Sequence, residues 1–301
     1  MRERIAVIGA GLMGHGIAQV FAVAGYEVAI TDPIESARAG ALDKIRANLA
    51  ELDQDPKAAD RVRVQPDLAA TVREADLIIE AAPENLKLKQ QLFADIEAAA
   101  KASALLASNT SVIPITAIME KVRDKSRALG THWWNPPFLV PLVEVIRTAQ
   151  TSDAAVARTI SVLTKAGKTA VEVKKDVPGF VGNRLQHALW REAIALVEEG
   201  ICDAETVDAV VKASFGRRLA VLGPLENADL VGTDLTLAIH ETVLPHIDCR
   251  PGPSPFLRQL VADNRLGFKS GEGFRRWPPS EQQNLRKRVF DYLKGFDERK
   301  V

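Results

Sequence analysis

The chain has 301 residues, of which 47% are hydrophobic and 26% are charged, as in an ordinary soluble globular protein. Its 39 basic and 39 acidic side chains balance, which leaves no excess positive charge for a nucleic acid, and no apolar run approaches the roughly 20 residues that a membrane-spanning helix needs. We therefore expect two domains, no nucleic-acid partner and no membrane span.

The two cysteines, Cys202 and Cys249, indicate a reducing compartment, and neither has a second ligand at metal-binding spacing. The first residues enter a strand pattern directly, without the layout of a signal peptide. We expect a cytoplasmic protein without a metal site.

A glycine-rich turn follows the first predicted strand. The apolar run 4–8 predicts a buried strand, the turn Gly9-Ala10-Gly11-Leu12-Met13-Gly14 comes next, and residues 16–24 have an apolar helical pattern. A second strand, predicted at 27–31, ends at Asp32. This order of strand, glycine turn, helix, strand and acid is typical of a dinucleotide-binding fold.

The positions in this turn have separate physical reasons. Gly9 permits the tight turn, Gly11 lets the backbone approach a pyrophosphate, and Gly14 lets the helix pack closely on the strand. Asp32, 18 residues after Gly14 (32 − 14), is placed to accept hydrogen bonds from an adenosine ribose, and its charge repels a 2′-phosphate. NAD is therefore the predicted cofactor, with a glycine turn of another α/β protein as the alternative. The predicted cofactor-binding residues here are Gly9, Gly11, Leu12, Met13, Gly14 and Asp32.

Strand and helix patterns alternate as far as residue 174. Further strands are predicted at 61–64, 75–82, 104–107, 127–131, 142–146 and 169–174, and helices at 36–52, 86–100 and 152–166, with another helix from near Thr116. This alternation predicts an α/β fold with a mostly parallel, doubly wound sheet.

Polar residues follow several of these strands at the carboxyl edge, where open α/β sheets bind ligands. Glu84 and Lys89 follow the strand at 75–82, and Ser111 follows the strand at 104–107. Alternatively, Glu84 is an acid in a first helical turn, Lys89 lies on a solvated face, and the hydroxyl residues are helix caps.

The segment 131–146 places a histidine and a glutamate near one another. His132 lies among aromatic residues, and Glu144 follows 12 positions later (144 − 132) within an apolar strand pattern. A carboxylate in such a strand needs a partner. An imidazole bonded to it through one ring nitrogen keeps the other nitrogen free as a base near neutral pH. The alternative is a core histidine with a satisfied hydrogen bond beside an unrelated edge glutamate.

The composition changes at residues 176–180, where a Pro-Gly step ends the strand patterns. We predict a dinucleotide-binding domain at residues 1–178 and a helical domain at residues 179–301. Asn183 lies at the start of a long predicted helix, either as a helix cap or where a second domain would close over the first. The apolar faces of the helical domain predict a homodimer interface.

Several motifs, in this order, resemble those of the L-3-hydroxyacyl-CoA dehydrogenase family over nearly the whole chain. They are the glycine turn 9–16, Pro83–Lys89, Ser108–Ser111, His132-x-x-Asn135-Pro136, Leu142–Val145, Pro178–Arg184 and Lys269–Phe274. The resemblance implies a Rossmann-type sheet followed by an all-α domain, and an NAD-dependent dehydrogenase that acts on a hydroxyl group of a small-molecule substrate.

The resemblance also implies roles for single residues. His132 matches the family's catalytic base, and Glu144 matches the carboxylate that orients it. Ser111 and Asn183 match positions that hydrogen-bond the reacting oxygen. The matched positions near the nicotinamide ribose or ring are Glu84, Lys89 and Asn135.

Two features differ from the acyl-CoA enzymes of the family. The stretch between Asp32 and Ala75 is shorter than the helical hairpin that helps those enzymes hold CoA, and Trp133-Trp134-Asn135-Pro136-Pro137 differs from their Phe-Phe-Asn-Pro-Val form. The double proline is similar to branches that oxidise free acids, namely L-gulonate 3-dehydrogenase with lambda-crystallin and the bacterial pyridine-carboxylate dehydrogenases of vitamin B6 breakdown. A free hydroxy acid or aromatic carboxylate is therefore the favoured substrate.

Other interpretations stay open. Residues 253–255 and 269–274 are close to the acyl-CoA type, which favours a CoA thioester. Decarboxylating β-hydroxyacid dehydrogenases share the glycine loop but rely on an interdomain lysine, where this chain has Asn183. A catalytically silent, crystallin-like NAD-binding protein would be favoured by loss of a catalytic residue, and all four are present. Candidates for holding a substrate carboxylate are Arg184, Arg217 and Arg218.

Overall fold

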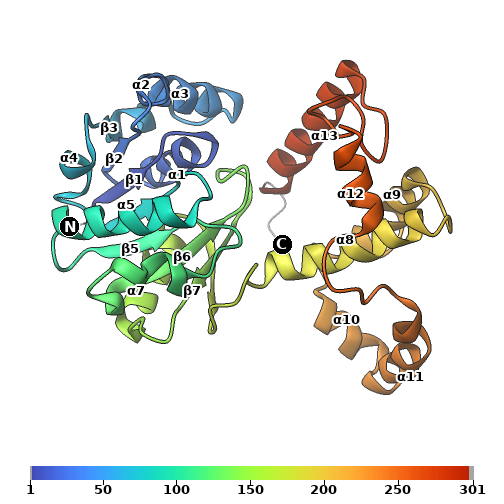
Figure 1. Ribbon diagram of the computed structural model, residues 1–301. Coiled ribbons are helices and arrows are strands. Elements are labelled where there is room, and N and C mark those ends of the chain that lie inside the picture. Colours follow the sequence, from blue (N-terminus) through green and yellow to red (C-terminus); the bar gives the residue numbers. More distant parts are fainter. Residues whose placement is uncertain (1, 298–301) are drawn as a thin grey trace. The chain divides into compact units, whose positions relative to one another are not determined.

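The computed structural model describes residues 2–297 and divides into two compact units, one ending at Arg184 and the other beginning at Leu185 (Figure 1). Met1 and residues 298–301, which the predicted domains include, lie outside the described residues.

The first unit is built on one eight-stranded sheet in the order β3-β2-β1-β4-β5-β6-β7-β8 (Figure 1). The strands are β1 (Ile5–Ile8), β2 (Val28–Thr31), β3 (Val62–Val64), β4 (Leu77–Glu80), β5 (Leu105–Ser108), β6 (Ala128–Trp133), β7 (Leu142–Ile146) and β8 (Thr169–Val173). Neighbouring strands are parallel except β6 and β7, which are antiparallel. The strand order reverses between β1 and β4, as in a Rossmann-type doubly wound sheet, so the predicted fold class is confirmed.

Helices cover both faces of this sheet. They are α1 (Leu12–Val23), α2 (Glu35–Ala39), α3 (Ala41–Glu51), η1 (Pro56–Arg61), α4 (Leu68–Val72), α5 (Leu86–Ala99), α6 (Ile115–Ile118), η2 (Met119–Lys121), η3 (Lys125–Arg127) and α7 (Asp153–Lys165). Alternate strand residues enter two separate cores: Ile79 packs in the cluster that includes α1, α3 and α7, and Ile78 in the cluster that includes α5 and α6. Since side chains alternate along a strand, burial on both faces explains the continuous apolar runs.

Some predicted boundaries move by a few residues for local reasons. The helix predicted at 36–52 is interrupted at Gly40, which ends α2 and begins α3, in keeping with glycine's poor helix propensity. Helix α1 begins at Leu12 rather than Gly16, because the glycine turn itself runs into the first helical turn. Strand β6 extends to Trp133, so His132 lies inside a strand that pairs with β7. Helix α4 was not predicted.

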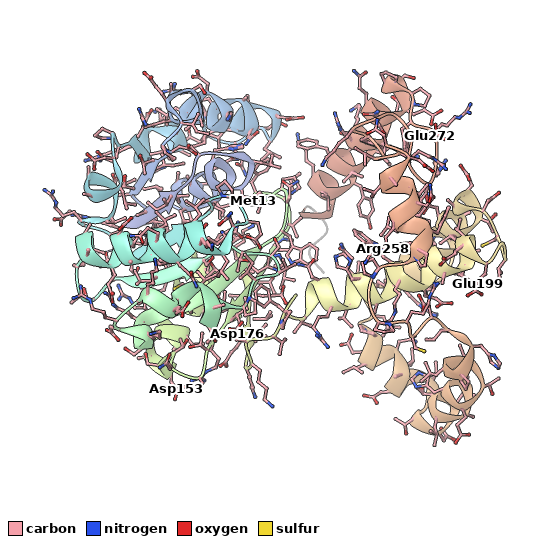
Figure 2. All side chains as sticks on the ribbon, viewed as in Figure 1. Met13, Asp153, Asp176, Glu199, Arg258 and Glu272 are labelled. Atoms are coloured by element: carbon pink, nitrogen blue, oxygen red, sulfur yellow. The ribbon has the colours of Figure 1, made fainter. Side chains whose placement is uncertain are left out.

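The segment before the second unit is tied to the sheet. Asp176, labelled in Figure 2, follows β8, and its carboxylate accepts hydrogen bonds from the backbone N–H groups of Ile115 (3.0 Å) and Thr116 (2.6 Å) at the start of α6. The composition change at 176–180 therefore falls on chain that still packs in the first unit, where Phe180 is fully buried.

The second unit is helical. Its elements are α8 (Gly182–Glu198, whose first turn belongs to the first unit), α9 (Ala204–Ala213), η4 (Phe215–Arg217), α10 (Pro224–Val231), α11 (Thr233–Val243), η5 (Leu244–His246), α12 (Pro255–Ala262) and α13 (Pro279–Asp297). Among its described residues there are only isolated β-bridges, at Gly267–Glu272 and Glu272–Arg276, and the only buried hydrophobic residues are Ala195 and Leu260. The predicted change from strands to helices is confirmed, but a core of ordinary size is missing from this unit.

Candidate functional site

The glycine turn joins β1 to α1 in a conformation that needs glycine. Gly9 has a φ of +105°, and a Cβ on Gly14 would lie 1.8 Å from the carbonyl oxygen of Gly9. A Cβ on Gly11, in contrast, would meet no atom within 4 Å, so nothing inside the chain requires a glycine there. Together with the N-terminus of α1, which no side chain caps, this open position fits the close approach of a pyrophosphate. Of the two intervening residues, Leu12 is exposed and Met13 half-buried.

Asp32 lies at the end of β2, beside the glycine turn. Its carboxylate accepts hydrogen bonds from the backbone N–H groups of Ala10 (2.7 Å) and Ile34 (2.9 Å), which fixes the acid against the turn. Each carboxylate oxygen keeps a second lone pair with which to accept a ribose hydroxyl. Sequence reasoning missed Arg38, whose guanidinium reaches back to donate to the backbone carbonyl of Asp32 at 2.8 Å.

His132 and Glu144 face one another across the antiparallel pair β6–β7. The two residues are direct register partners, and His132 Nδ1 lies 2.7 Å from Glu144 Oε2. Both side chains are almost completely buried, at 4% and 1% exposure. Because an ionised carboxylate only accepts hydrogen bonds, Nδ1 carries a proton, and in the neutral imidazole Nε2 then keeps a free lone pair.

Glu144 is held in its ionised form by the residues around it. Burial by itself raises the pKa of this carboxyl group, but the hydrogen bonds from His132 and from the backbone N–H groups of Gly182 (3.0 Å) and Val181 (2.9 Å) outweigh it, and the pKa falls below its usual value. The two amides belong to the chain that enters α8. The site therefore joins β6, β7 and the start of α8.

Aromatic rings enclose the imidazole. The centroid of His132 lies 5.2 Å from that of Trp134 and 5.6 Å from that of Phe180. Trp133, the other tryptophan of the pair, points into the core, where it is 2% exposed and meets Phe21 edge-on at 5.7 Å. One of the two tryptophans is thus a core residue, and the other lies beside the histidine.

The structure also brings Ser111 and Asn183 together. The side-chain amide of Asn183, in the first turn of α8, donates to the backbone carbonyl of Ser111 at 2.9 Å. Asn183 is buried, whereas Ser111 is exposed. Asn135 is also exposed, immediately after β6, and Arg184, the residue after Asn183, is exposed as well.

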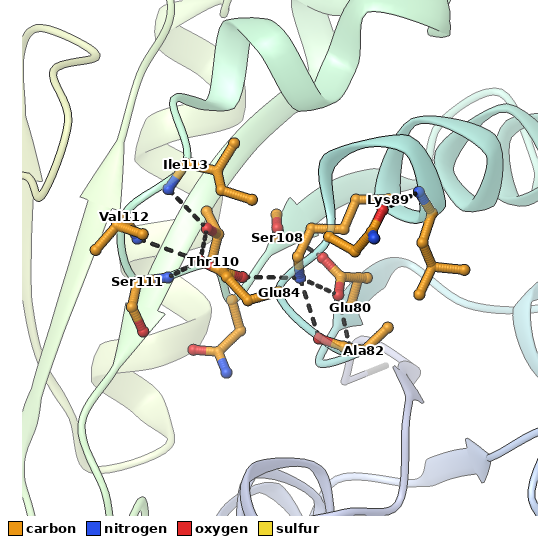
Figure 3. A network of polar contacts seen from close by, with 12 residues as sticks. Glu80, Ala82, Glu84, Lys89, Ser108, Thr110, Ser111, Val112 and Ile113 are labelled. Atoms are coloured by element: carbon orange, nitrogen blue, oxygen red, sulfur yellow. Dashed lines mark hydrogen bonds and ion pairs between the residues drawn. The ribbon is translucent and has the colours of Figure 1, made fainter. Parts of the chain in front are cut away.

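A polar network lies at the carboxyl ends of β4 and β5 (Figure 3). Glu84 accepts hydrogen bonds from the backbone N–H groups of Ser111 (3.0 Å) and Val112 (3.3 Å) and from the Thr110 hydroxyl. Burial raises the pKa of Glu84, but the hydrogen bond from Thr110, the charge of Lys89 and the two backbone hydrogen bonds together outweigh it and lower the pKa. The Glu84 side chain remains 37% exposed, so a ligand can still reach it.

Lys89 is not on a solvated face: its side chain is only 1% exposed. Its ammonium group lies 2.6 Å from Glu80 Oε1, 3.2 Å from the carbonyl oxygen of Ala82 and 3.4 Å from Glu84 Oε2. Sequence reasoning missed Glu80, although an acid at the end of an otherwise apolar strand pattern was a signal that could have found it.

Two kinds of feature have no candidate among the described residues. Within residues 2–297, no three histidine, cysteine or carboxylate side chains are arranged to hold a metal ion. No helix in that range combines the length and apolar character that crossing a membrane requires. Cys202 and Cys249 are free thiols.

Comparison with known protein families gives two matches along the chain. The family description "3-hydroxyacyl-CoA dehydrogenase, NAD binding domain" matches residues 4–177, and "3-hydroxyacyl-CoA dehydrogenase, C-terminal domain" matches residues 179–277.

Individual relatives cover nearly the whole chain. The 5-formyl-3-hydroxy-2-methylpyridine 4-carboxylate 5-dehydrogenase of Mesorhizobium japonicum is 34% identical over 95% of this chain and 94% of its own. A crystal structure of an enzyme of this name, described as an NAD⁺-dependent dismutase, has a TM-score of 0.92 at 33% identity, covering 99% of this chain and 98% of that one. The (S)-3-hydroxybutyryl-CoA dehydrogenase of Ralstonia eutropha has a TM-score of 0.77 at 32% identity, covering 92% of this chain and 100% of that one.

Proposed function

We propose a specific reaction and substrate class for this chain, which belongs to the 3-hydroxyacyl-CoA dehydrogenase family and is an NAD-dependent dehydrogenase acting on a hydroxyl group. The reaction is hydride transfer between NAD and an alcohol, or an aldehyde hydrate, close to a free carboxyl group. The observation that carries it is the buried contact of 2.7 Å between His132 and Glu144 at the carboxyl-terminal half of β6.

In the oxidative direction His132 is the general base. Its free Nε2 takes the proton of the substrate hydroxyl while the carbon gives up its hydride, so the C–H and O–H bonds break as the carbonyl forms. Bound NAD supplies the hydride acceptor. Glu144, kept ionised by two backbone amides, stabilises the imidazolium that results.

Ser111 and Asn183 are the proposed partners of the reacting oxygen. The contact between the Asn183 amide and the Ser111 carbonyl keeps these two residues adjacent, and one N–H of the amide remains for the oxygen. Glu84, Lys89 and Asn135 are proposed to surround the nicotinamide ribose or ring, and Glu84, the one carboxylate among them, is 37% exposed.

A free carboxylate is proposed as the substrate in preference to a CoA thioester. At nearly equal sequence identity, the TM-score is 0.92 with the pyridine-carboxylate dehydrogenase and 0.77 with the hydroxybutyryl-CoA dehydrogenase. Between β2 and β4 the chain forms the short elements α2, α3, η1, β3 and α4. These observations support a site without the long helical hairpin that the resemblance associates with CoA.

The test is a substrate panel followed by the absorbance of NADH. It contains 3-hydroxybutyryl-CoA, L-gulonate, L-carnitine, 3-hydroxybutyrate and 5-formyl-3-hydroxy-2-methylpyridine 4-carboxylate. We expect turnover of a free carboxylate and little of the thioester. Turnover of the thioester alone would replace the substrate assignment, and NADH binding without any turnover would contradict the proposed substrates while leaving the dehydrogenase chemistry in place.

A homodimer formed by the second unit is proposed on a separate observation. The helical arm, which we define as residues 224–246 (α10, α11 and η5), contains no buried residue. Its exposed apolar side chains are Leu225, Leu230, Val231, Leu235, Leu237, Ile239, Val243 and Leu244. The same unit contains a largely apolar groove of about 600 Å³ between α8, α9, α12 and residues 265–277.

The arm and the groove differ in charge. The arm carries four acidic side chains and no lysine or arginine. The groove is lined by Arg265, Lys269 and Arg275, with Arg265 paired to Glu272 and Arg275 paired to Glu205 and Asp208. Because one chain presents both surfaces, a second copy is the proposed occupant, with each arm in the other copy's groove around a twofold axis. Burial of these apolar faces would give the second unit the core that it lacks alone.

The dimer is tested by the molar mass in solution, from light scattering, across a range of concentrations. We expect a dimer, and we expect Leu237→Glu on the arm to shift it towards monomer. Val171→Glu, on an exposed apolar residue of β8 in the first unit, is the matched control and leaves the dimer intact. A wild-type monomer, or equal effects of the two variants, contradicts the proposal.

The cytoplasmic location expected from the two cysteines also stays a proposal.

A further inference from the structure

The buried network at the end of β4 contains one charged residue that the proposed chemistry does not use. Glu80 is the last residue of β4 and has no exposed surface. A carboxylate at such a position is unfavourable unless its oxygens are satisfied. Its partners therefore stabilise Glu80 in this position, and one of them, Lys89, also contacts Glu84 of the candidate site.

Four hydrogen bonds hold Glu80 at one edge of the sheet. Oε2 accepts from the Ser108 hydroxyl at 2.6 Å, at the end of β5. Oε1 accepts from the Lys89 ammonium at 2.6 Å and from the backbone N–H of Ala82 at 2.6 Å. The Glu80 backbone carbonyl accepts from the N–H of Asn109 at 2.8 Å. The residue thus joins β4, β5 and α5.

Lys89 connects Glu80 to Glu84, because its ammonium group contacts both carboxylates. Its ammonium group donates to Glu80 and to the carbonyl oxygen of Ala82. The third partner is Glu84, whose Oε2 lies 3.4 Å away (Figure 3). Two carboxylates therefore share one ammonium group. Removing the charge of Glu80 leaves Glu84 as the only anionic partner of Lys89 in this network.

Glu84 in turn holds the loop that carries Ser111. One oxygen, Oε1, accepts from the Thr110 hydroxyl and from two successive backbone amides, those of Ser111 and Val112. The Thr110 hydroxyl also accepts from the N–H of Ile113 at 3.1 Å, so the turn 110–113 closes around this contact. A change in the position of Glu84 consequently changes the position of Ser111.

We infer that Glu80 is a positioning residue for the dehydrogenase reaction, acting through Lys89 and Glu84 to hold Ser111 where it meets the reacting oxygen. This inference rests on the proposed role of Ser111. Glu80 has no exposed surface with which to meet substrate or cofactor. Its proposed effect is therefore geometric, since a displacement of about 1 Å in a residue that orients a substrate can cost on the order of a hundredfold in rate.

The test compares Glu80→Gln with Glu97→Gln. Glu97 is a matched control because it is also a buried acid, on α5, paired with Arg127 at 3.3 Å and with the backbone amides of Arg123 and Asp124. Both variants lose a buried charge next to a cation, and both should melt at a lower temperature. Only Glu80 is connected to Ser111, through Lys89 and Glu84.

Two readouts separate positioning from general loss of stability. In Glu80→Gln we expect hydrogen exchange of the backbone amides at 109–113 to rise about tenfold while the β1 amides stay protected. We expect kcat to fall about tenfold or more, with the Kd for NADH changed less than about threefold. Glu97→Gln should leave kcat and the exchange at 109–113 close to wild type. Equal behaviour of the two variants overturns the inference.

A milder variant decides the matter if Glu80→Gln does not fold. Ser108→Ala removes the hydroxyl that donates to Glu80 and keeps the carboxylate, so a smaller rise in exchange at 109–113 is expected, and no rise overturns the inference. Exchange and NADH binding need no substrate. Failure of the substrate panel in the wild-type enzyme is therefore distinguishable from failure of this inference.

Discussion

The two units of the chain bury their apolar side chains to different extents. In the first unit, strands such as β1, β4 and β5 are buried at every position. In the second unit, α9, α10 and α11 contain no buried residue at all. The first unit therefore has the rigid core that a catalytic site needs, whereas the second buries few apolar side chains of its own, and the proposed dimer would bury more of them.

The largest effect is expected from removal of the proposed catalytic base in the first unit. We expect His132→Ala to lower kcat by about a thousandfold, because general base catalysis contributes on the order of 10²–10⁴. The Kd for NADH should change little, since His132 lies on β6 and the glycine turn follows β1. Steady-state kinetics and NADH fluorescence titration measure the two quantities. Equal loss of binding and turnover would contradict the role of His132.

Stability measurements sharpen the contrast in burial. Leu106 in β5 is fully buried, and we expect Leu106→Ala to lower the free energy of unfolding by about 2–5 kcal/mol at any protein concentration. Leu237 in the helical arm is 60% exposed in the single chain. Truncation of an exposed side chain changes stability by only about 0.5 kcal/mol or less. If a second copy covers Leu237, its truncation instead gives a larger loss at concentrations where the wild type is dimeric, and this loss shrinks on dilution.

Cofactor choice is a further property of the first unit. We expect Asp32→Ala to weaken NAD binding about ten- to a hundredfold, because hydrogen bonds to a charged group contribute about 1.5–3 kcal/mol. Discrimination against NADP should relax as well, since the repelling charge is gone and Arg38 lies next to this position. Kd values for both cofactors measure the change. An unaltered preference would mean that Asp32 does not meet the ribose.

The smallest expected effect is a pH dependence of stability. Hydrogen bonds lower the pKa of Glu144 in the folded protein below that of the unfolded chain, near 4.5. A depressed pKa stabilises the fold above the unfolded value, and this contribution is lost as the pH falls through the folded value. We expect the free energy of unfolding of the wild type, measured with urea, to fall below a pH of about 4.5. It should fall more steeply than the free energy of unfolding of Glu144→Gln. Parallel curves would show that Glu144 gains nothing on folding.

Local patterns predicted most of the first unit. The turn Gly9–Gly14, the acid at Asp32 and the strand runs follow from steric requirements and side-chain periodicity, which act over a few residues. The spacing of His132 and Glu144 also indicated a pair, because each falls in a predicted strand or at its end. The break at Gly40 and helix α4 were missed, since short helices carry little periodic signal.

Tertiary structure alone decided where the charges meet. Sequence determined that an acid ends β4 and that a lysine follows nine residues later in α5, but the ion pair of Glu80 and Lys89 depends on how the helix folds back on the sheet. Two hydrogen bonds to backbone carbonyls, from Arg38 to Asp32 and from Asn183 to Ser111, 72 residues apart, likewise depend on how the chain folds. Sequence likewise determined that the second unit is helical and amphipathic, while only the structure revealed how few of its apolar side chains are buried. The reason is physical: backbone preference is local, whereas burial and electrostatic pairing depend on distances between residues far apart in the chain.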